Sequence, residues 1–239
     1  MLLFYIRHGR PIYDPDSLRP EGRRQAEALA RRLALFGIDR VFASSSNRAI
    51  ETARPTCEIC ELEMTVLDWC NESYAWDDTC VRREDGSFYW GYATPLWRRR
   101  FVSEEVQRLG ADWYDHPWFA GTKFKQGIQR VNREADAFLA SLGYVHDRSR
   151  HLYAAERPND ERVALFAHEG FGKMFLSSVL DIPYCVFCTR FELGYTGMSV
   201  IEFTVEDDGL CIPRALMVSA DGHLYRDGLP TNYQNRVRF

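Results

Sequence analysis

The sequence lacks long hydrophobic runs and an excess of positive charge. No apolar stretch reaches the length that is needed to span a bilayer. The apolar run at 1–6, MLLFYI, is too short for a signal-peptide core, has no basic region before it and leads directly into Arg7. The formal net charge is −4, which gives no general electrostatic support to a nucleic-acid partner. We therefore expect a cytoplasmic protein that binds neither a membrane nor nucleic acid.

The sequence also lacks the pattern of a disulfide framework, because its seven cysteines are odd in number and do not have small-domain spacing. Two pairs, Cys57/Cys60 and Cys185/Cys188, have C-x-x-C spacing and could together form a four-thiolate zinc site. Each pair lies in or beside an apolar segment with a helical pattern, where cysteines three apart usually pack as small hydrophobic residues. We favour this second interpretation and predict no metal site.

The sequence does contain enough apolar residues for a sizeable core. Hydrophobic residues make up 46% of 239 residues, which suits one large domain or one domain with an insertion. Strands are predicted over 1–6, 39–44, 63–69 and 162–168, and helices over 19–38, 46–62 and 169–182. Gly37 is the expected stop of the first helix, and Ser45 or Ser46 is a candidate cap of the second. The segments 198–205 and 214–220 are expected final strands and candidates for an antiparallel edge. The alternation predicts a three-layer αβα fold over 1–239 with a mainly parallel central sheet.

The stretch from about Ser73 to Asn132 interrupts this alternation. It is rich in aromatic residues, including Trp76, Trp90, Trp97, Trp113 and Trp118. Linkers are not this aromatic, so we expect an inserted, mostly helical cap at approximately 73–132. Most of these rings are expected to form the core of the cap itself rather than a binding surface.

Polar residues that could take part in catalysis or ligand binding lie where the predicted strands end. Arg7 and His8 follow the first strand, and Arg48 lies just inside the helix after the second. Glu72 lies five residues beyond Leu67, near the end of the third, and His168 closes the segment VALFAH. Ligands of parallel α/β sheets collect outside the carboxyl ends of the strands, so these side chains are expected at one edge.

This set of groups suits phosphoryl transfer. Arginines bind phosphoryl oxygens through planar, bidentate contacts. A neutral imidazole can attack phosphorus and form a phosphohistidine. A carboxyl group with a raised pKa can protonate the departing alkoxide. Each residue alone has an ordinary structural explanation, but their coincidence at strand ends favours a common site.

With these residues in place, the sequence resembles the histidine phosphatase superfamily, also called phosphoglycerate-mutase-like. The R-H-G signature of that family is matched at 7–9, and "LRPEGRRQA" and "SSSNRAIETA" echo two further blocks. The residues that align in those blocks are Gly22, Gln25, Ala26, Arg48, Thr52 and Ala53. Glu72 corresponds to the acid/base glutamate of the family, and His168, in "FAHEG", corresponds to its second histidine. The matches fall in order and span most of the chain outside the expected cap.

The resemblance implies a metal-independent phosphatase that needs no cofactor and acts on a small phosphate ester. His8 is then the nucleophile, and Glu72 first protonates the leaving oxygen and later activates water. Arg7, Arg48 and His168 hold the phosphoryl oxygens. Asp77 and Asp78 lie close enough to Glu72 in the sequence to compete for the acid role.

The sequence departs from the family pattern at several positions. Arg10, Pro11 and Asp14 occupy places that often read E-T-x-x-N, and we assign no phosphate-binding role to Asp14. Glu169 replaces the small residue usual after the second histidine. Its backbone N–H is a candidate phosphate contact, whereas its carboxylate either points elsewhere or selects a cationic substrate group.

Two other functions are left open by the sequence. A phosphomutase would return the phosphoryl group to a second hydroxyl under a solvent-excluding cap. A binding protein on the same fold would have lost activity, although every catalytic residue type is present. The sequence identifies neither the substrate nor the oligomeric state.

Overall fold

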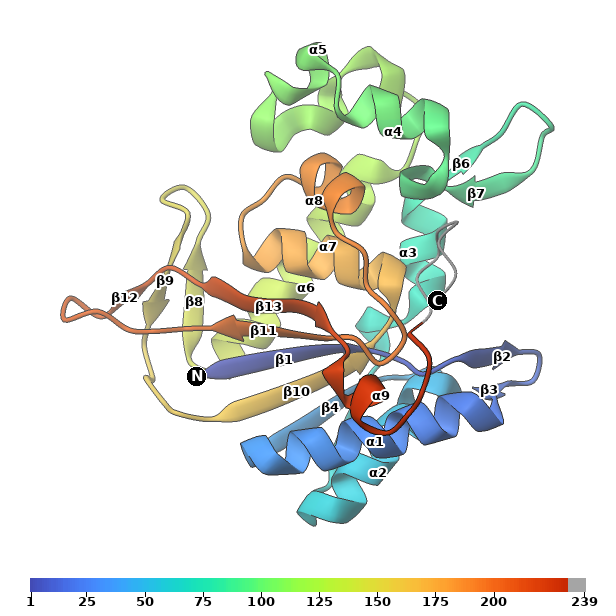
Figure 1. Ribbon diagram of the computed structural model, residues 1–239. Coiled ribbons are helices and arrows are strands. Elements are labelled where there is room, and N and C mark those ends of the chain that lie inside the picture. The colour runs from blue at the N-terminus through green and yellow to red at the C-terminus, as the bar shows by residue number, and fades with distance from the viewer. Residues whose placement is uncertain (232–239) are drawn as a thin grey trace.

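The computed structural model describes residues 1–231 and contains a central six-stranded sheet in the order β13-β11-β1-β10-β4-β5 (Figure 1). The strands β1 (Leu2–Arg7), β10 (Arg162–Ala167), β4 (Arg40–Ser44) and β5 (Met64–Leu67) are parallel neighbours. Strand β11 (Met198–Glu202) is antiparallel to β1, and β13 (Arg214–Ala220) is antiparallel to β11. The predicted α/β fold, with its mainly parallel sheet and antiparallel edge, is therefore confirmed.

The two central strands are apolar except for Arg7 at the end of β1 and Arg162 at the start of β10, because both faces of the sheet are covered. In β1, Leu3 and Tyr5 belong to one hydrophobic cluster and Phe4 and Ile6 to another. Strand β10 alternates in the same way along 163–167. Successive side chains of a strand point to opposite faces, so each face receives half of the run. The sequence VALFA thus contributes to two cores at once.

One face of the sheet is covered by α1 (Pro20–Phe36) and α2 (Asn47–Cys60), which lie together at the bottom of Figure 1. Helix α1 ends as predicted at Gly37, whose positive φ of 72° lets its N–H bond back to the last turn. Ser46 occupies the N-cap position of α2, but its side chain makes no capping hydrogen bond. The short helix α9 (Gly222–Arg226) packs against α1.

The other face is covered by α6 (Phe124–Ser141) and α7 (Glu169–Val179), with α8 (Tyr184–Arg190) packed on α7 (Figure 1). All eleven residues of α7 are buried. The two C-x-x-C pairs are separated by the sheet, since Cys57 packs with the α1/α2 cluster whereas Cys185 and Cys188 pack in the opposite one. They are therefore not placed to share one metal ion.

The segment predicted as a cap contains short helices, one hairpin and the first part of α6; in Figure 1, α3 lies beside α7, and α4 and α5 lie above α8. Its elements are α3 (Glu72–Thr79), β6 (Cys80–Arg82), β7 (Phe88–Trp90), η2 (Gly91–Ala93), α4 (Pro95–Phe101), α5 (Glu104–Gln107), η3 (Gly110–Asp115) and η4 (Pro117–Phe119). Phe101, Trp113 and Phe119 are buried together with ring centroids 4.9–5.6 Å apart. These rings pack together and against Tyr184 of α8. Other aromatic residues of the segment are exposed, namely Tyr74, Trp76, Phe88, Tyr89 and Trp118.

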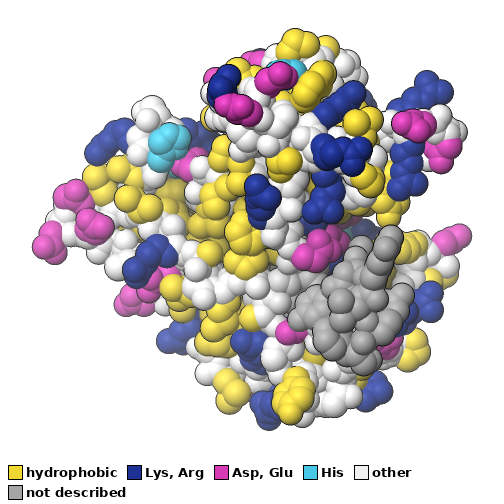
Figure 2. Space-filling model, turned by 45° about the horizontal axis from the view of Figure 1, so that its top comes forward, with side chains coloured by type: hydrophobic (Ala, Val, Ile, Leu, Met, Phe, Trp, Pro, Cys, Tyr) yellow, Lys and Arg dark blue, Asp and Glu magenta, His cyan; other side chains and the backbone are white. Residues whose placement is uncertain are grey.

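The remaining strands form small sheets at the periphery. Strands β8 (Tyr144–Asp147), β9 (Leu152–Ala155) and β12 (Leu210–Cys211) form one, and β2 (Pro11–Tyr13) pairs with β3 (Asp16–Leu18). Acidic and basic side chains are interspersed over the face shown in Figure 2. Within residues 1–231, no helix is both long and apolar enough to cross a membrane.

Candidate active site

His8 stands at the carboxyl end of β1, where the sheet register places it beside His168. Arg7 pairs with Ala167, so the residues that follow these two strands emerge at the same level. The backbone N–H of His8 donates to the carbonyl of Ala167 at 2.9 Å, and the two imidazole centroids are 5.2 Å apart. Parallel pairing thus brings together two histidines that are 160 positions apart in the numbering.

The ring of His8 is held in a single orientation. Its Nδ1 lies 2.7 Å from the carbonyl oxygen of Gly9, which can only accept, so Nδ1 carries the proton. Burial, followed by the charges of Arg7 and Arg48, holds the pKa of His8 well below its usual value. The imidazole is therefore neutral, and Nε2 keeps its lone pair, which accepts from Arg48 Nε at 3.3 Å.

The loop beneath His8 is fixed by residues that the motif blocks supply. A Cβ on Gly9 would lie 2.6 Å from the carbonyl oxygen of Gly22, so the backbones meet directly. The N–H of Gly9 donates to Thr52 Oγ1 at 3.0 Å, and the N–H of Arg10 donates to Gln25 Oε1 at 2.9 Å. The aligned glycines, glutamine and threonine therefore hold the turn that presents the imidazole.

Arg48 connects the two histidines. Besides His8, it donates from Nη2 to His168 Nδ1 at 3.2 Å, and its Nη1 is paired with Asp16 at 2.8 Å. His168 Nε2 lies 2.8 Å from Ser44 Oγ and 3.1 Å from Ser46 Oγ. Burial and the neighbouring His8 and Arg48 hold the pKa of His168 well below its usual value. Both imidazoles are therefore neutral, and Arg48, which is held by Asp16, donates to both of them.

Arg7 is buried beside Glu169, which forms an ion pair with it at 2.8 Å. The other carboxylate oxygen of Glu169 pairs with the buried Lys173 at 2.9 Å. Arg7 Nη1 also donates to the carbonyl of Leu193 at 2.5 Å, and its guanidinium lies over the ring of Tyr195, 4.1 Å from the centroid. Both oxygens of Glu169 are thus paired with cations of the protein, and its carboxylate is not free to bind a cationic substrate group.

This arrangement predicts a stability effect at Glu169. Burial acts to raise the pKa of this carboxyl, but Arg7 and Lys173 outweigh it and lower the pKa in the folded protein. The ionised form therefore stabilises the fold above the ordinary pKa of glutamate, and this contribution is lost as the pH falls. We expect Glu169→Gln to lower the free energy of unfolding by about 3 kcal/mol at pH 7, since it leaves buried cations without a partner.

Urea unfolding of both proteins measures this difference. Glu21→Gln is the matched control, because Glu21 pairs with Arg10 at 2.6 Å on the surface, where a pair contributes less than about 1 kcal/mol. Equal losses for the two variants, or a loss that does not shrink as the pH is lowered, would contradict the assignment.

Glu72 is the first residue of α3 and directs its carboxylate at the start of α7. The backbone N–H groups of Gly170 and Phe171 each donate to it at 2.8 Å. Burial raises its pKa to about 7, and these two hydrogen bonds and the charge of Arg7 only partly offset that effect. A carboxyl with this pKa can both give and accept a proton near neutral pH.

Trp90 packs against Gly170, at the same turn of α7 that binds the carboxylate of Glu72. A Cβ on Gly170 would lie 2.5 Å from the ring of Trp90 and 3.0 Å from Glu72 Oε1. Only glycine allows the indole and the carboxylate to meet over this turn of α7. The indole thereby contributes to the burial that raises the pKa of Glu72.

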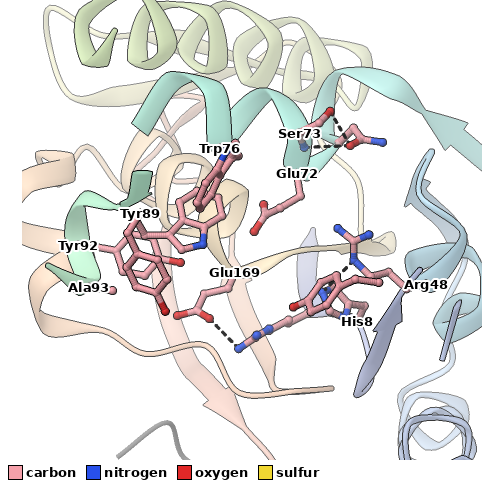
Figure 3. Close-up of a pocket in the computed structure, with 13 residues that line it drawn as sticks. His8, Arg48, Glu72, Ser73, Trp76, Tyr89, Tyr92, Ala93 and Glu169 are labelled. Carbon is pink, nitrogen blue, oxygen red and sulfur yellow. Dashed lines mark hydrogen bonds and ion pairs between the residues drawn. The ribbon is translucent and has the colours of Figure 1, made fainter. Parts of the chain in front are cut away.

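These side chains line one cavity of about 450 Å³ (Figure 3). Its lining includes Arg7, His8, Arg48, Glu72 and Glu169, whereas His168 lies behind Arg48. The remaining lining residues are Tyr13, Asn71, Ser73, Trp76, Tyr89, Trp90, Tyr92 and Ala93. The structure thus brings together every residue that the sequence predicted for the site.

The two other carboxylates considered for the acid role, those of Asp77 and Asp78, lie outside the cavity. Asp77 is exposed and paired with Lys123 at 2.7 Å, and Asp78 is paired with Arg130 at 2.7 Å. Neither lines the cavity. Asp14 is exposed and does not line it either.

Sequence reasoning missed several residues that support the site. Asp16 holds Arg48, and Lys173 holds Glu169. The spacing of Lys173 four residues after Glu169 on one helix was a usable signal. No comparable signal marked Asp16, since its contact depends on how the β2–β3 hairpin folds back on α2.

Comparison with known proteins identifies a sequence family and several solved structures with a similar fold. Residues 3–78 match the family model of the histidine phosphatase superfamily (branch 1). No curated protein matches the sequence. Among solved structures, mycobacterial glucosyl-3-phosphoglycerate phosphatase is 17% identical, with a TM-score of 0.58 over 92% of this chain and 98% of that one.

Two other solved structures are similar to the same extent. The phosphoserine phosphatase of Entamoeba histolytica, solved with phosphoserine, is 16% identical with a TM-score of 0.58, covering 93% of this chain and 98% of that chain. A putative alpha-ribazole-5'-P phosphatase of Escherichia coli is 18% identical with a TM-score of 0.56, covering 92% and 98%. At these identities the likeness shows a shared fold.

Proposed function

We propose that the chain is a histidine phosphatase, as the family match over residues 3–78 supports, and that it hydrolyses a phosphate monoester in two steps through a phosphohistidine on His8. The observation that carries this proposal is the state of His8. Its imidazole is neutral, its Nδ1 proton is engaged by Gly9, and its Nε2 lone pair faces cationic donors. A neutral, oriented nitrogen nucleophile beside arginines is what attack on a phosphoryl group requires.

In the first step, His8 Nε2 attacks phosphorus and the ester P–O bond breaks. The leaving oxygen takes the bond electrons together with the proton of the Glu72 carboxyl. The positive charge that develops on the imidazole is stabilised by the hydrogen bond from Nδ1 to the carbonyl of Gly9. Release of the alcohol leaves the phosphohistidine and an ionised Glu72.

In the second step, the Glu72 carboxylate removes a proton from water, and the water oxygen attacks phosphorus. The N–P bond breaks, and its electron pair returns to His8 Nε2. Glu72 ends the cycle protonated, as it began. Its pKa of about 7 supports both roles.

Arg7, Arg48 and His168 are proposed to hold the phosphoryl oxygens in both steps. The buried Nε–H of Arg7 has no hydrogen-bond partner among residues 1–231, and a phosphoryl oxygen would supply one. The backbone N–H of Glu169, at the start of α7, is a further proposed contact, although its carboxylate is paired with Arg7 and Lys173. Preformed donors of this kind stabilise the charge of the transition state without reorganisation.

We further propose that residues 73–132 act as a cap over the site and that the protein works in the cytoplasm. All seven cysteines are free, which supports a reducing compartment.

Turnover of a generic aryl phosphate by the purified protein, with and without a phosphate-accepting alcohol, tests the proposed enzymatic function. We expect inorganic phosphate to be released, with no transfer of the phosphoryl group to the acceptor. Quantitative transfer to the acceptor would favour a phosphomutase, and absence of turnover would favour a binding protein.

The proposed mechanism predicts that activity does not depend on a divalent metal. Arginine side chains take the electrophilic role that metal ions have in two-metal phosphatases. We expect phosphate release to be unchanged after exhaustive chelation of the purified protein and its buffers. Loss of activity on chelation that zinc or manganese restores would overturn this part of the mechanism.

A further inference from the structure

The cavity around Glu72 has two chemically different ends. The cationic residues that line it among residues 1–231, Arg7 and Arg48, lie beside His8 at the end proposed for phosphate. The opposite end is built from Trp76, Tyr89, Trp90 and Tyr92, which we call the aromatic wall (Figure 3). A leaving alcohol must occupy this end, because Glu72 has to reach its oxygen.

The aromatic wall is a fixed surface. Trp76 meets Trp90 edge to face with centroids 4.9 Å apart, and Trp90 stacks on Tyr92 at 5.4 Å. Tyr92 is buried, with Lys173 Nζ 3.7 Å from its ring centroid. Trp76 and Tyr89 remain 36% and 39% exposed at the rim. Aromatic faces with accessible area at a pocket rim bind the flat apolar faces of rings.

The charges near the aromatic wall are already neutralised by one another. Both oxygens of Glu169 are taken by Arg7 and Lys173, and Lys173 also lies 3.3 Å from Glu192. Arg83 lies over the ring of Tyr89, 3.9 Å from its centroid, but it does not line the cavity. Within the described part of the chain, no residue that lines this end of the cavity is therefore a cation that could pair with a carboxylate or second phosphate of a substrate. An anionic leaving group beside the aromatic wall would lose its hydration without a cation to compensate for that loss.

Resting on the proposed function, we propose that the leaving alcohol of the substrate is uncharged and carries a ring whose face packs on the aromatic wall. Sugar phosphates and nucleoside monophosphates share this chemistry. On this proposal the wall disfavours small charged alcohols without a ring, such as glycerate, an anion, and serine, a zwitterion. The specificity of this chain thus differs from what a phosphoserine or phosphoglycerate site would require.

The test compares kcat/KM for alkyl phosphates whose leaving alcohols differ in charge and shape. Glucose 6-phosphate and a nucleoside 5′-monophosphate have uncharged rings, glycerol 3-phosphate is uncharged without a ring, and 3-phosphoglycerate is anionic without a ring. We expect at least one ring ester to exceed glycerol 3-phosphate by about tenfold or more and 3-phosphoglycerate to fall below it by about tenfold. The two ring esters distinguish a sugar from a nucleoside as the occupant.

Variants of the aromatic wall test whether these side chains cause the expected preference for ring esters. Trp76→Ala and Tyr89→Ala are expected to lower kcat/KM for the preferred ring ester by about tenfold more than for glycerol 3-phosphate. Trp118→Ala is the matched control, because Trp118 is 39% exposed but does not line the cavity. It is expected to behave as the unchanged protein for every ester.

The outcomes separate this inference from the proposed function. Hydrolysis that depends on His8 but is fastest with 3-phosphoglycerate overturns the inference and leaves the function intact. Equal losses for ring and linear esters in Trp76→Ala also overturn it. If no ester is hydrolysed, the function fails, and calorimetric binding of glucose 6-phosphate and the nucleotide against 3-phosphoglycerate still decides the inference. Equal or tighter binding of 3-phosphoglycerate than of both ring esters would then refute it.

Discussion

Replacing His8 with alanine is expected to lower kcat/KM by about 10⁴-fold or more for every phosphate ester, because it removes the atom that bonds to phosphorus. Rapid quenching of the unchanged protein with labelled substrate should trap label that is labile in acid and stable in base, the behaviour of a phosphoramidate. The variant should trap none. The measurement is single-turnover kinetics together with recovery of the labelled protein.

The His8→Ala variant requires a control for folding, since His8 is buried beside Arg48. Thermal unfolding monitored by circular dichroism should show a cooperative transition in the variant. Its affinity for inorganic phosphate should persist, because Arg7, Arg48 and His168 are unchanged. Substantial turnover by a folded variant would refute His8 as the nucleophile.

Glu72→Gln is expected to slow the first step by about 10³-fold for alkyl phosphates and by less than about tenfold for nitrophenyl phosphate. Alkoxides are strongly basic and need the proton of Glu72, whereas nitrophenolate leaves with little help. Because the same carboxylate is proposed to activate water, the phosphohistidine should accumulate when this variant is given nitrophenyl phosphate. Burst kinetics with both esters measure the two rates separately.

The pH dependence of the first step provides an independent readout. The pKa of Glu72 is raised to about 7, so the protonated acid is depleted above that pH. Phosphorylation by alkyl esters should therefore slow above about pH 7 in the unchanged protein, and this limb should disappear in Glu72→Gln. Asp77→Asn and Asp78→Asn are the matched controls, because both carboxylates lie outside the cavity. A leaving-group-dependent loss in either control, with Glu72→Gln unaffected, would contradict the assignment.

Local patterns were sufficient to predict the framework. The buried runs at 3–6 and 163–167 could be recognised because a strand covered on both faces is apolar at successive positions. The helix that ends at Gly37 was recognisable from apolar spacing and from a residue that tolerates positive φ. Because parallel strands present their carboxyl ends at one edge, the order of the elements also predicted which polar residues would meet there.

The sequence by itself determined the strands of the central sheet, several of the helices that cover it and the residue types at the carboxyl edge of its parallel strands. The tertiary structure decided the states of those residues. Gly170 and Phe171, far from Glu72 in the chain, set its hydrogen bonds, and burial under a ring from another segment raised its pKa to about 7. Lys173 and Arg7 together decided that the carboxylate of Glu169 is an internal partner rather than a contact for a cationic substrate group. Propensity and periodicity act over a few residues, whereas burial and charge depend on which distant segments pack together, and only the folded chain fixes that.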